Sequence, residues 1–353
     1  MKKLIGLLLA AVLLLAAAAF LLLGGCAAMG DTQQAGSAQQ AGSAQRAGSA
    51  QRAGSAQRAG SAQQADSAQR TGSAQRAGSI VVTDFPCYDL VRRVMGTEEG
   101  LTLLIRPGTD AHMYEPTPAD AMALYGADVF VYIGGHGDAW ADEILRAADG
   151  LAVVRLMDSV EALEEEHGHG EEHGHEDISY DEHIWTSPVN MRAMLKTVGE
   201  ALSTVYPGNA ELYRANAAAY DQELVALDAS FREVVDGAAR TELVFADRFP
   251  FLYFAREYGL TYRSAFAGCS DDVQPSVQAV ASIIKAVEDD GVPIVYVIEM
   301  STEDIARAVK EQTGAEIVKM HSCQNVTQRE FEAGETYLTL MRRNVEALKK
   351  GLE

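Results

Sequence analysis

Short apolar segments alternate with amphipathic helical segments along residues 80–160. Four runs of apolar and mostly β-branched residues predict strands, at 80–83, 101–105, 129–133 and 152–156. Helical spacing between these runs predicts helices, at 85–95, 118–125 and 139–148. Asp84 stands where a capping residue would stand, and Pro118 where a helix would begin. This alternation is typical of a parallel α/β sheet.

The alternation begins again after a long helical stretch. Helical spacing covers residues 188–205, breaks at Pro207-Gly208, and resumes from Asn209 to about residue 235. The resumed run is too long for a crossover inside one small sheet, so we expect a helix that spans two lobes. Further strands are predicted at 242–246, 261–265, 293–298 and 316–320, and further helices at 250–258, 275–289, 302–312 and 330–349. The predicted fold class is α/β, with two parallel-sheet lobes joined by one long helix and a ligand clamped between them.

The N-terminus carries the pattern of an export signal. Two lysines precede an unbroken apolar run over residues 4–25, and Leu23-Gly24-Gly25-Cys26 matches the bacterial lipobox. We therefore expect a signal peptide at residues 1–25 and a lipidated Cys26, with a plain membrane anchor as the alternative. Both interpretations place the rest of the chain outside the cytoplasmic membrane, attached to its outer face.

Residues 35–79 repeat the hexapeptide A-G-S-A-Q-R or a near copy of it. The repeat holds no large apolar side chain, so it cannot offset the entropy cost of folding. We expect a disordered tether over residues 26–79, with a mean span of about 40 Å. The expected domains that follow are an N-terminal lobe at 80–207, a linking helix at 208–237 and a C-terminal lobe at 238–353.

Charge is distributed unevenly between the tether and the body. The chain has 29 basic and 50 acidic residues, of which residues 1–79 hold seven and two. The remaining 22 basic and 48 acidic residues give the body a charge of −26. A body of this charge is repelled by nucleic acid and by anionic lipid, and it mildly concentrates cations. Nucleic acid is therefore excluded as a partner.

A histidine-rich run stands in the middle of the chain, over residues 164–177. Its histidines form two H-G-H pairs, His167 with His169 and His173 with His175. Neutral imidazole is the commonest protein ligand for zinc and similar metals. Glycine and glutamate between the histidines predict a solvated loop, so the run is interpreted as an auxiliary site of metal capture. The alternative is an acidic loop with incidental histidines.

Several polar residues directly follow predicted strands, where ligands of parallel sheets bind. These residues are His112, His136, Asp247, Glu299 and His321, and His183 stands in an ordered turn before a helix. Because zinc needs three or four nitrogen, oxygen or sulfur ligands, these residues predict one metal site in the cleft.

Each candidate also has an ordinary structural explanation. His112 and His183 would then be capping or core residues, and His136 would point to water between its glycine neighbours. Asp247 would pair with Arg248. Glu299 would cap the helix that follows it, and His321 would flank a cystine.

The cysteines divide by their surroundings. Cys269 and Cys323 lie in polar, turn-rich segments, and an exported protein favours a disulfide between them. The loop-entropy relation gives such a bridge about 4 kcal/mol of stabilisation. Cys87 is then expected to be a small buried hydrophobic residue.

Three segments together resemble a known family. They are RPGTDAHMYEPTPAD around His112, DEHIWTSPVN around His183, and FAREYGL in the second half of the chain. This combination resembles the solute-binding lipoproteins of zinc and manganese ABC importers, of the ZnuA type. The resemblance implies two four-stranded α/β lobes on a rigid helix, with the metal held in the cleft. It also implies a monomer that delivers metal to an ABC permease and catalyses no reaction.

The remaining ligands depart from the family's pattern. Where the family usually has a third histidine, this chain has Asp247-Arg248, so Asp247 or His136 takes that place. The fourth position falls near His321, with Glu299 as the alternative. The histidine-rich run favours zinc as cargo, while His112 and His183 alone would serve manganese as well.

Two functions of other classes are alternatives. His173-Gly174-His175-Glu176-Asp177 matches the H-x-H-x-D pattern of zinc hydrolases, but its flexible flanks contradict an ordered active site and no H-E-x-x-H occurs. A tethered lipoprotein could also act as a surface adhesin. Zinc-dependent turnover would indicate the first, and zinc-independent binding to matrix proteins the second.

Overall fold

The computed structural model describes residues 78–165, 179–266, 275 and 277–353. Cys26, the hexapeptide tether, the histidines at 167, 169, 173 and 175, and Cys269 lie outside the described residues. Within the described part of the chain, no helix is both long enough and apolar enough to cross a membrane.

The N-terminal sheet is parallel throughout and has the strand order β2-β1-β3-β4. Its strands are β1 (Ile80–Val82), β2 (Leu101–Leu103), β3 (Val129–Tyr132) and β4 (Ala152–Arg155). Alternate residues serve opposite faces, as strand geometry requires. Ile80 and Val82 pack on one face with α2 (Phe85–Met95) and α5 (Pro188–Val205), whereas Val81 packs on the other with α3 (Pro118–Tyr125) and α4 (Ala141–Leu145).

The C-terminal sheet repeats this arrangement with the order β6-β5-β7-β8, again parallel. Its strands are β5 (Glu242–Phe245), β6 (Thr261–Ser264), β7 (Ile294–Val297) and β8 (Glu316–Lys319). One face packs against α7 (Leu252–Tyr258) and α11 (Tyr337–Leu352), and the other against α8 (Val277–Asp289) and α9 (Asp304–Thr313). The prediction of two parallel α/β lobes is confirmed.

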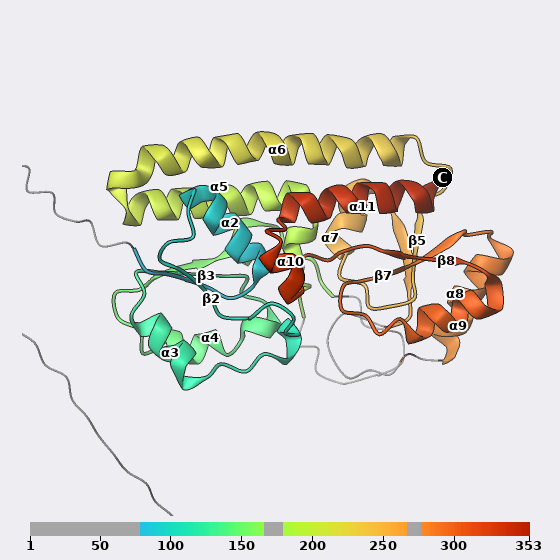
Figure 1. Ribbon diagram of the computed structural model, residues 1–353, viewed down its shortest axis with the longest axis horizontal. Helices are drawn as coiled ribbons and strands as arrows, with labels where there is room; N and C mark the ends of the chain where they lie inside the picture. Colours follow the sequence, from blue (N-terminus) through green and yellow to red (C-terminus); the bar gives the residue numbers. More distant parts are fainter. Residues whose placement is uncertain (1–77, 166–178, 267–274, 276) are drawn as a thin grey trace, which may run out of the picture. The chain divides into compact units, whose positions relative to one another are not determined.

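A single long helix, α6 (Ala210–Asp236), follows the N-terminal lobe. Figure 1 shows it alongside both α5 and α11, and it also contacts α2 and α7. Its buried face is a stripe at helical spacing, formed by Tyr213, Tyr220, Leu224, Leu227 and Phe231. These side chains belong to one continuous core that includes residues of both lobes. The helix therefore links the lobes by packing as well as by chain connection.

Trp185 joins the two lobes close to the cleft. It lies on the short turn η4 (Ile184–Thr186) of the N-terminal lobe and is 1% exposed. Its indole N–H donates to the carbonyl oxygen of Ser322, just after β8, at 2.8 Å. Its own carbonyl oxygen accepts from the hydroxyl of Tyr337 in α11, also at 2.8 Å. Because all these groups are buried, each bond satisfies a polar atom that water cannot reach.

One sequence expectation needs correction. Residues 330–349 do not form one helix, because α10 (Gln328–Glu332) ends before Gly334 and α11 begins at Tyr337. Gly334 has φ of +75°, a conformation that stops a helix and favours glycine. Thr336 then starts the next helix with a capping box in which its hydroxyl accepts from the backbone N–H of Thr339.

Candidate metal centre

His112, Glu182 and His183 come together at the carboxyl edge of the N-terminal sheet. Each offers one ligand atom, and these atoms all lie within 4.8 Å of one another. The rings of His112 and His183 have centroids 5.5 Å apart. His112 lies in the short turn η1 (Ala111–Met113), where the Asp110 side chain accepts from its backbone N–H at 3.1 Å. The structure thus brings together His112 and His183, the two predicted ligands on which the family resemblance rests.

Asp181 fixes the orientation of His183. One oxygen of Asp181, Oδ1, accepts from the backbone N–H of His183 at 2.8 Å and faces its Nδ1 at 3.2 Å. Because a carboxylate only accepts hydrogen bonds, Nδ1 must carry the proton. The lone pair then lies on Nε2, the nitrogen through which this tautomer binds a metal. His183 is 3% exposed, so this arrangement is shielded from water.

Asp181 is itself held from two sides. Its backbone N–H donates to the carbonyl oxygen of Leu163 at 2.9 Å, and its carbonyl oxygen accepts from the hydroxyl of Tyr253 at 2.8 Å. Next to these bonds, Glu165 N–H donates to Ser179 O at 2.9 Å, and an antiparallel bridge joins residues 164 and 180. The two described ends that flank residues 166–178 therefore meet beside the histidines.

Glu182 holds the other histidine. Its Oε1 lies 3.3 Å from His112 Nδ1, and its Oε2 accepts from the backbone N–H of Gly137 at 2.8 Å. A Cβ atom built on Gly135 would lie 2.2 Å from Glu182 Cβ, so only glycine permits this approach. Burial alone would raise the pKa of Glu182. The His112 hydrogen bond, the charges of both histidines and the Gly137 N–H outweigh burial and lower that pKa to about 2.

Two further carboxyl groups, those of Asp84 and Asp138, line a small pocket together with Glu182. Burial raises the pKa of Asp138 to about 8, and the charges of Asp84 and Glu182 act in the same direction. Burial likewise raises the pKa of Asp84 to about 6. Asp138 accepts from the backbone N–H of Gly134 at 2.9 Å, and Asp84 caps α2 through Cys87 N–H at 3.1 Å. Both side chains therefore have structural partners of their own.

A cavity of about 400 Å³ opens beside His112 and is lined by both lobes. The N-terminal lobe contributes the loop around Asp110 and His112, and the C-terminal lobe contributes Asp247, Glu299 and Gln324. This cavity is the cleft in which the sequence predicted a metal site. The strands of both sheets end toward it, which agrees with the general position of ligands in parallel α/β folds.

Asp247 and Glu299 line the cleft, but their oxygens serve the C-terminal lobe. Asp247 accepts from the backbone N–H groups of Arg248 at 2.8 Å and Ile298 at 3.2 Å. Glu299 accepts from the backbone N–H of Ser322 at 2.7 Å and from its hydroxyl, and it does not cap the helix that follows. Neither residue belongs to the group formed by His112, Glu182 and His183 among the described residues.

The structure does not bring His136 or His321 into that group. His136 is exposed, because its neighbours Gly135 and Gly137 pack against Glu182 and leave its side chain outside. His321 is 4% exposed, and its Nδ1 accepts from the Cys323 backbone N–H at 2.9 Å. Its Nε2 lies 4.0 Å from Glu330 Oε1.

Three residues of the site were missed by the sequence analysis. Asp181 and Glu182 stand directly before His183, and the third, Gln324, places its amide nitrogen 3.2 Å from His112 Nε2. The acidic pair immediately before a candidate histidine was an available signal, since ligating histidines commonly donate their second N–H to a carboxylate. No local signal pointed to Gln324.

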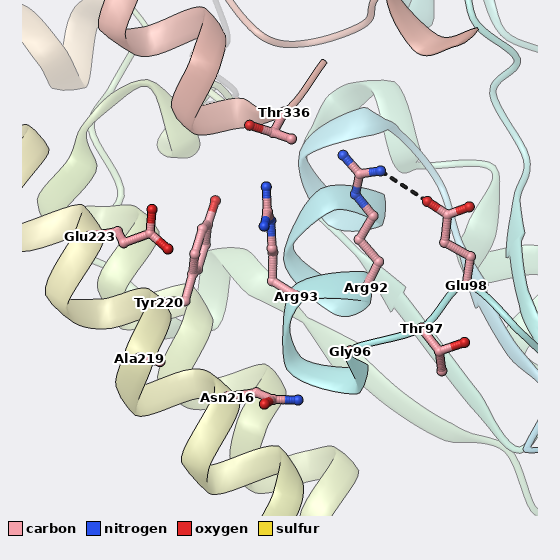
Figure 2. A pocket seen from close by; sticks show the side chains of 10 residues that line it. All are labelled: Arg92, Arg93, Gly96, Thr97, Glu98, Asn216, Ala219, Tyr220, Glu223 and Thr336. Atoms are coloured by element: carbon pink, nitrogen blue, oxygen red, sulfur yellow. Dashed lines mark hydrogen bonds and ion pairs between the residues drawn. The ribbon is translucent and has the colours of Figure 1, made fainter. Parts of the chain in front are cut away.

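A second cavity, of about 410 Å³, lies where α2, α6 and the start of α11 meet (Figure 2). Figure 2 shows Arg93 between Tyr220 and Arg92, and Arg92 pairs with Glu98 at 2.9 Å. The guanidinium of Arg93 lies over the Tyr220 ring, 5.4 Å from its centroid. This cavity contains none of the predicted metal ligands.

Cys87 and Cys323 are buried thiols in the structure, and Cys87 is fully buried as expected. Burial raises the pKa of both thiols well above the ordinary value. Since Cys269 lies outside the described residues, its disulfide with Cys323 stays a prediction.

Two parallel α/β lobes that enclose a polar cleft form an arrangement in which a ligand can be held between the lobes. Residues 80–351 match the family described as zinc-uptake complex component A, periplasmic, and the chain belongs to this family. The resemblance found in the His112 and His183 segments is thereby confirmed.

Curated relatives agree with this assignment. The zinc-binding lipoprotein AdcA of Streptococcus pneumoniae serotype 4 is 30% identical over 280 aligned residues, and the match covers 77% of this chain and 55% of that protein. This chain thus spans about half the length of the AdcA relatives it matches. The high-affinity zinc uptake system protein ZnuA of Bacillus subtilis is 29% identical over 279 residues, covering 77% of this chain and 87% of that protein.

Solved structures of relatives have the same fold. The Zn(II)-bound ZnuA-like domain of Streptococcus pneumoniae AdcA is 27% identical and superposes with a TM-score of 0.66, over 78% of this chain and 99% of that one. The metal-dependent lipoprotein YcdH of Bacillus subtilis is 26% identical with a TM-score of 0.67, over the same shares.

Proposed function

We propose that this protein captures zinc outside the cytoplasmic membrane and delivers it to the permease of an ABC importer. The observation that carries the proposal is the histidine pair, half-buried His112 and buried His183, in which each Nδ1 faces a carboxylate and the ring centroids lie 5.5 Å apart. The names of the relatives support zinc as the cargo.

The chemistry of the group fits a borderline metal. Imidazole nitrogen binds zinc, and the ligand atoms that His112, Glu182 and His183 offer all lie within 4.8 Å of one another. Two histidines held in fixed tautomers need little reorganisation when metal arrives. Manganese is the runner-up cargo, because it accepts the same nitrogen and oxygen ligands. We assign the protein a binding role without turnover.

The N-terminal segment would hold the protein at the membrane. A lipid on Cys26 would fix the protein to the outer face of the membrane, and residues 27–79 would hold the lobes within reach of the permease.

The histidine-rich run would collect metal near the site, because the residues that flank it meet beside Asp181. Replacing residues 166–178 by an Asn-Gly turn, which suits two antiparallel ends, should then lower zinc stoichiometry and leave the tight site. Unchanged stoichiometry and uptake would exclude a collecting role.

Metal titration tests the central proposal. The chain from residue 27 onward would be titrated with zinc and with manganese against a chromophoric chelator. We expect one tight zinc site that is lost in a His112→Ala/His183→Ala variant and retained in His136→Ala, the exposed histidine that serves as the matched control. A tight site that survives the double substitution would refute the cleft assignment.

A further inference from the structure

A segment after β8 crosses from the C-terminal lobe to the N-terminal lobe beside the metal centre. We call residues 322–326 the crossing segment. Asn325 Nδ2 donates to the carbonyl oxygens of Arg106 at 3.0 Å and Thr109 at 2.6 Å, and Gly108 N–H donates to Val326 O at 2.7 Å. The backbone of the crossing segment is therefore fixed on the loop that leads to His112.

Gln324 extends from this segment to the metal centre. Its Nε2 lies 3.2 Å from Nε2 of His112. Because Glu182 faces the other ring nitrogen, Nδ1 of neutral His112 is the donor and Nε2 is the acceptor. The amide N–H of Gln324 is then the matching donor, so this contact is a hydrogen bond to the lone pair of Nε2.

The same lone pair is the one that a metal needs. Nδ1 of His112 donates to Glu182 just as Nδ1 of His183 donates to Asp181. In both rings the second nitrogen is therefore the metal-binding one. At His112 that nitrogen already receives the amide of Gln324, and a metal ion and an N–H group cannot share one lone pair.

We propose that Gln324 is a gate residue: in the metal-free protein its amide caps His112 Nε2, and the incoming metal has to displace it. This inference rests on the proposed function, since it concerns the same histidine. The gate weakens metal binding by the free energy of one hydrogen bond and thereby favours release of the cargo.

Displacement needs only a side-chain movement. Asn325 and Val326 keep the crossing segment on the N-terminal lobe whether or not the amide is bound. Gln324 also lines the cleft cavity of about 400 Å³, so space for the displaced amide is available without separation of the lobes. The half-buried side chain moves into a polar region, where water can replace the lost hydrogen bond.

A glutamine suits this role better than its closest alternatives. A glutamate at 324 would add a charged ligand and bind the metal instead of yielding to it. An aliphatic residue would leave His112 Nε2 uncapped. The neutral amide offers a donor of moderate strength, which a metal can displace.

Removal of the amide is the direct test. In the full mature chain, Gln324→Ala should bind zinc about two- to tenfold more tightly, the equivalent of one ordinary hydrogen bond, and should release zinc more slowly to excess chelator. Gln328→Ala is the matched control, because Gln328 pairs with Glu332 on α10, where both side chains are exposed. Weaker binding by Gln324→Ala would overturn the proposal and make the amide a ligand. Unchanged affinity would also overturn it.

A second measurement separates this proposal from the zinc assignment. Long-range ¹H–¹⁵N spectra of the metal-free protein report which nitrogen of each histidine carries the proton. We expect the Nε2 signal of His112 to shift in Gln324→Ala and to stay unchanged in Gln328→Ala. No shift would refute the gate even if zinc binds as proposed. Retained zinc binding in the His112→Ala/His183→Ala variant would instead refute the proposed function.

Discussion

Asp181 offers the most direct test of how the metal centre is organised. It is 6% exposed, and one of its oxygens receives both the backbone N–H and the ring N–H of His183. Replacement by asparagine keeps an oxygen of the same size in place but removes the charge. Replacement by alanine removes both hydrogen bonds and lets the His183 ring rotate.

The expected magnitudes follow from these contacts. Hydrogen bonds to a charged group contribute about 1.5–3 kcal/mol, and loss of a residue that orients a metal ligand typically costs 10- to 100-fold in affinity. Asp181→Asn should therefore weaken zinc binding about tenfold, near 1.4 kcal/mol, and Asp181→Ala about 100-fold. Competition with a chromophoric chelator measures both constants. Circular dichroism would confirm that each variant is folded.

A matched control comes from the same lobe. Asp158 faces a basic side chain, with Arg155 Nη1 at 3.3 Å from its Oδ1, but both side chains are largely exposed. Asp158→Asn should leave zinc affinity unchanged, since exposed ion pairs contribute little. If Asp181→Ala bound zinc within about threefold of the unsubstituted protein, the orienting role of Asp181 would be refuted.

Three further predictions follow from the surroundings of the site. Gly135→Ala should lower zinc affinity, because the added Cβ would lie 2.2 Å from Glu182 Cβ and force that residue to move. Asp138→Asn should stabilise the metal-free protein more at pH 8 than at pH 5, measured by thermal unfolding with chelator present. The pKa of Asp138 is about 8 in the fold against 3.8 unfolded, so the native state binds the extra proton and loses stability as pH rises through that window. Trp185→Phe should cost about 1–3 kcal/mol in chemical denaturation, because it leaves the Ser322 carbonyl oxygen buried without its donor.

The predictions for Gly135, Asp138 and Trp185 each have a control or an outcome that would contradict them. Gly126→Ala adds a Cβ with only ordinary contacts, at 3.5 Å or more, and should leave zinc affinity unchanged. An equal gain in stability at both pH values would show that the proton on Asp138 is not responsible. An unchanged free energy of unfolding in Trp185→Phe would mean that water replaces the indole at Ser322.

Much of the fold was predictable from local pattern. Val129–Tyr132 is buried at every position, as a central parallel strand should be, and its apolar run was legible in the sequence. Asp84 caps its helix as its position suggested. The break at Gly334 was missed because apolar spacing continues on both sides of it. The glycine and the capping box at Thr336 were the signals that outweighed that spacing.

The site was only partly predictable, because its contacts are not local. His112 and His183 stand in turns that could be recognised, but the partner of Glu182 is the backbone of Gly137, 45 residues earlier. The fact that a residue directly follows a strand does not determine which way its side chain points, as His321 shows. The backbone N–H of His321 donates to Asn344 at 2.7 Å, and that anchor brings its ring near Glu330.

The hydrogen bond between Glu165 and Ser179 has a consequence for how such proteins can vary in evolution. Because the chain is closed at this bond, the number of residues between 165 and 179 has little influence on Asp181 and the histidine beside it. The entropy cost of joining two fixed ends rises by only about 0.6 kcal/mol for each doubling of the number of residues between them. Insertions, deletions and changes in histidine content can therefore accumulate in this segment while selection on the cleft histidines continues undisturbed.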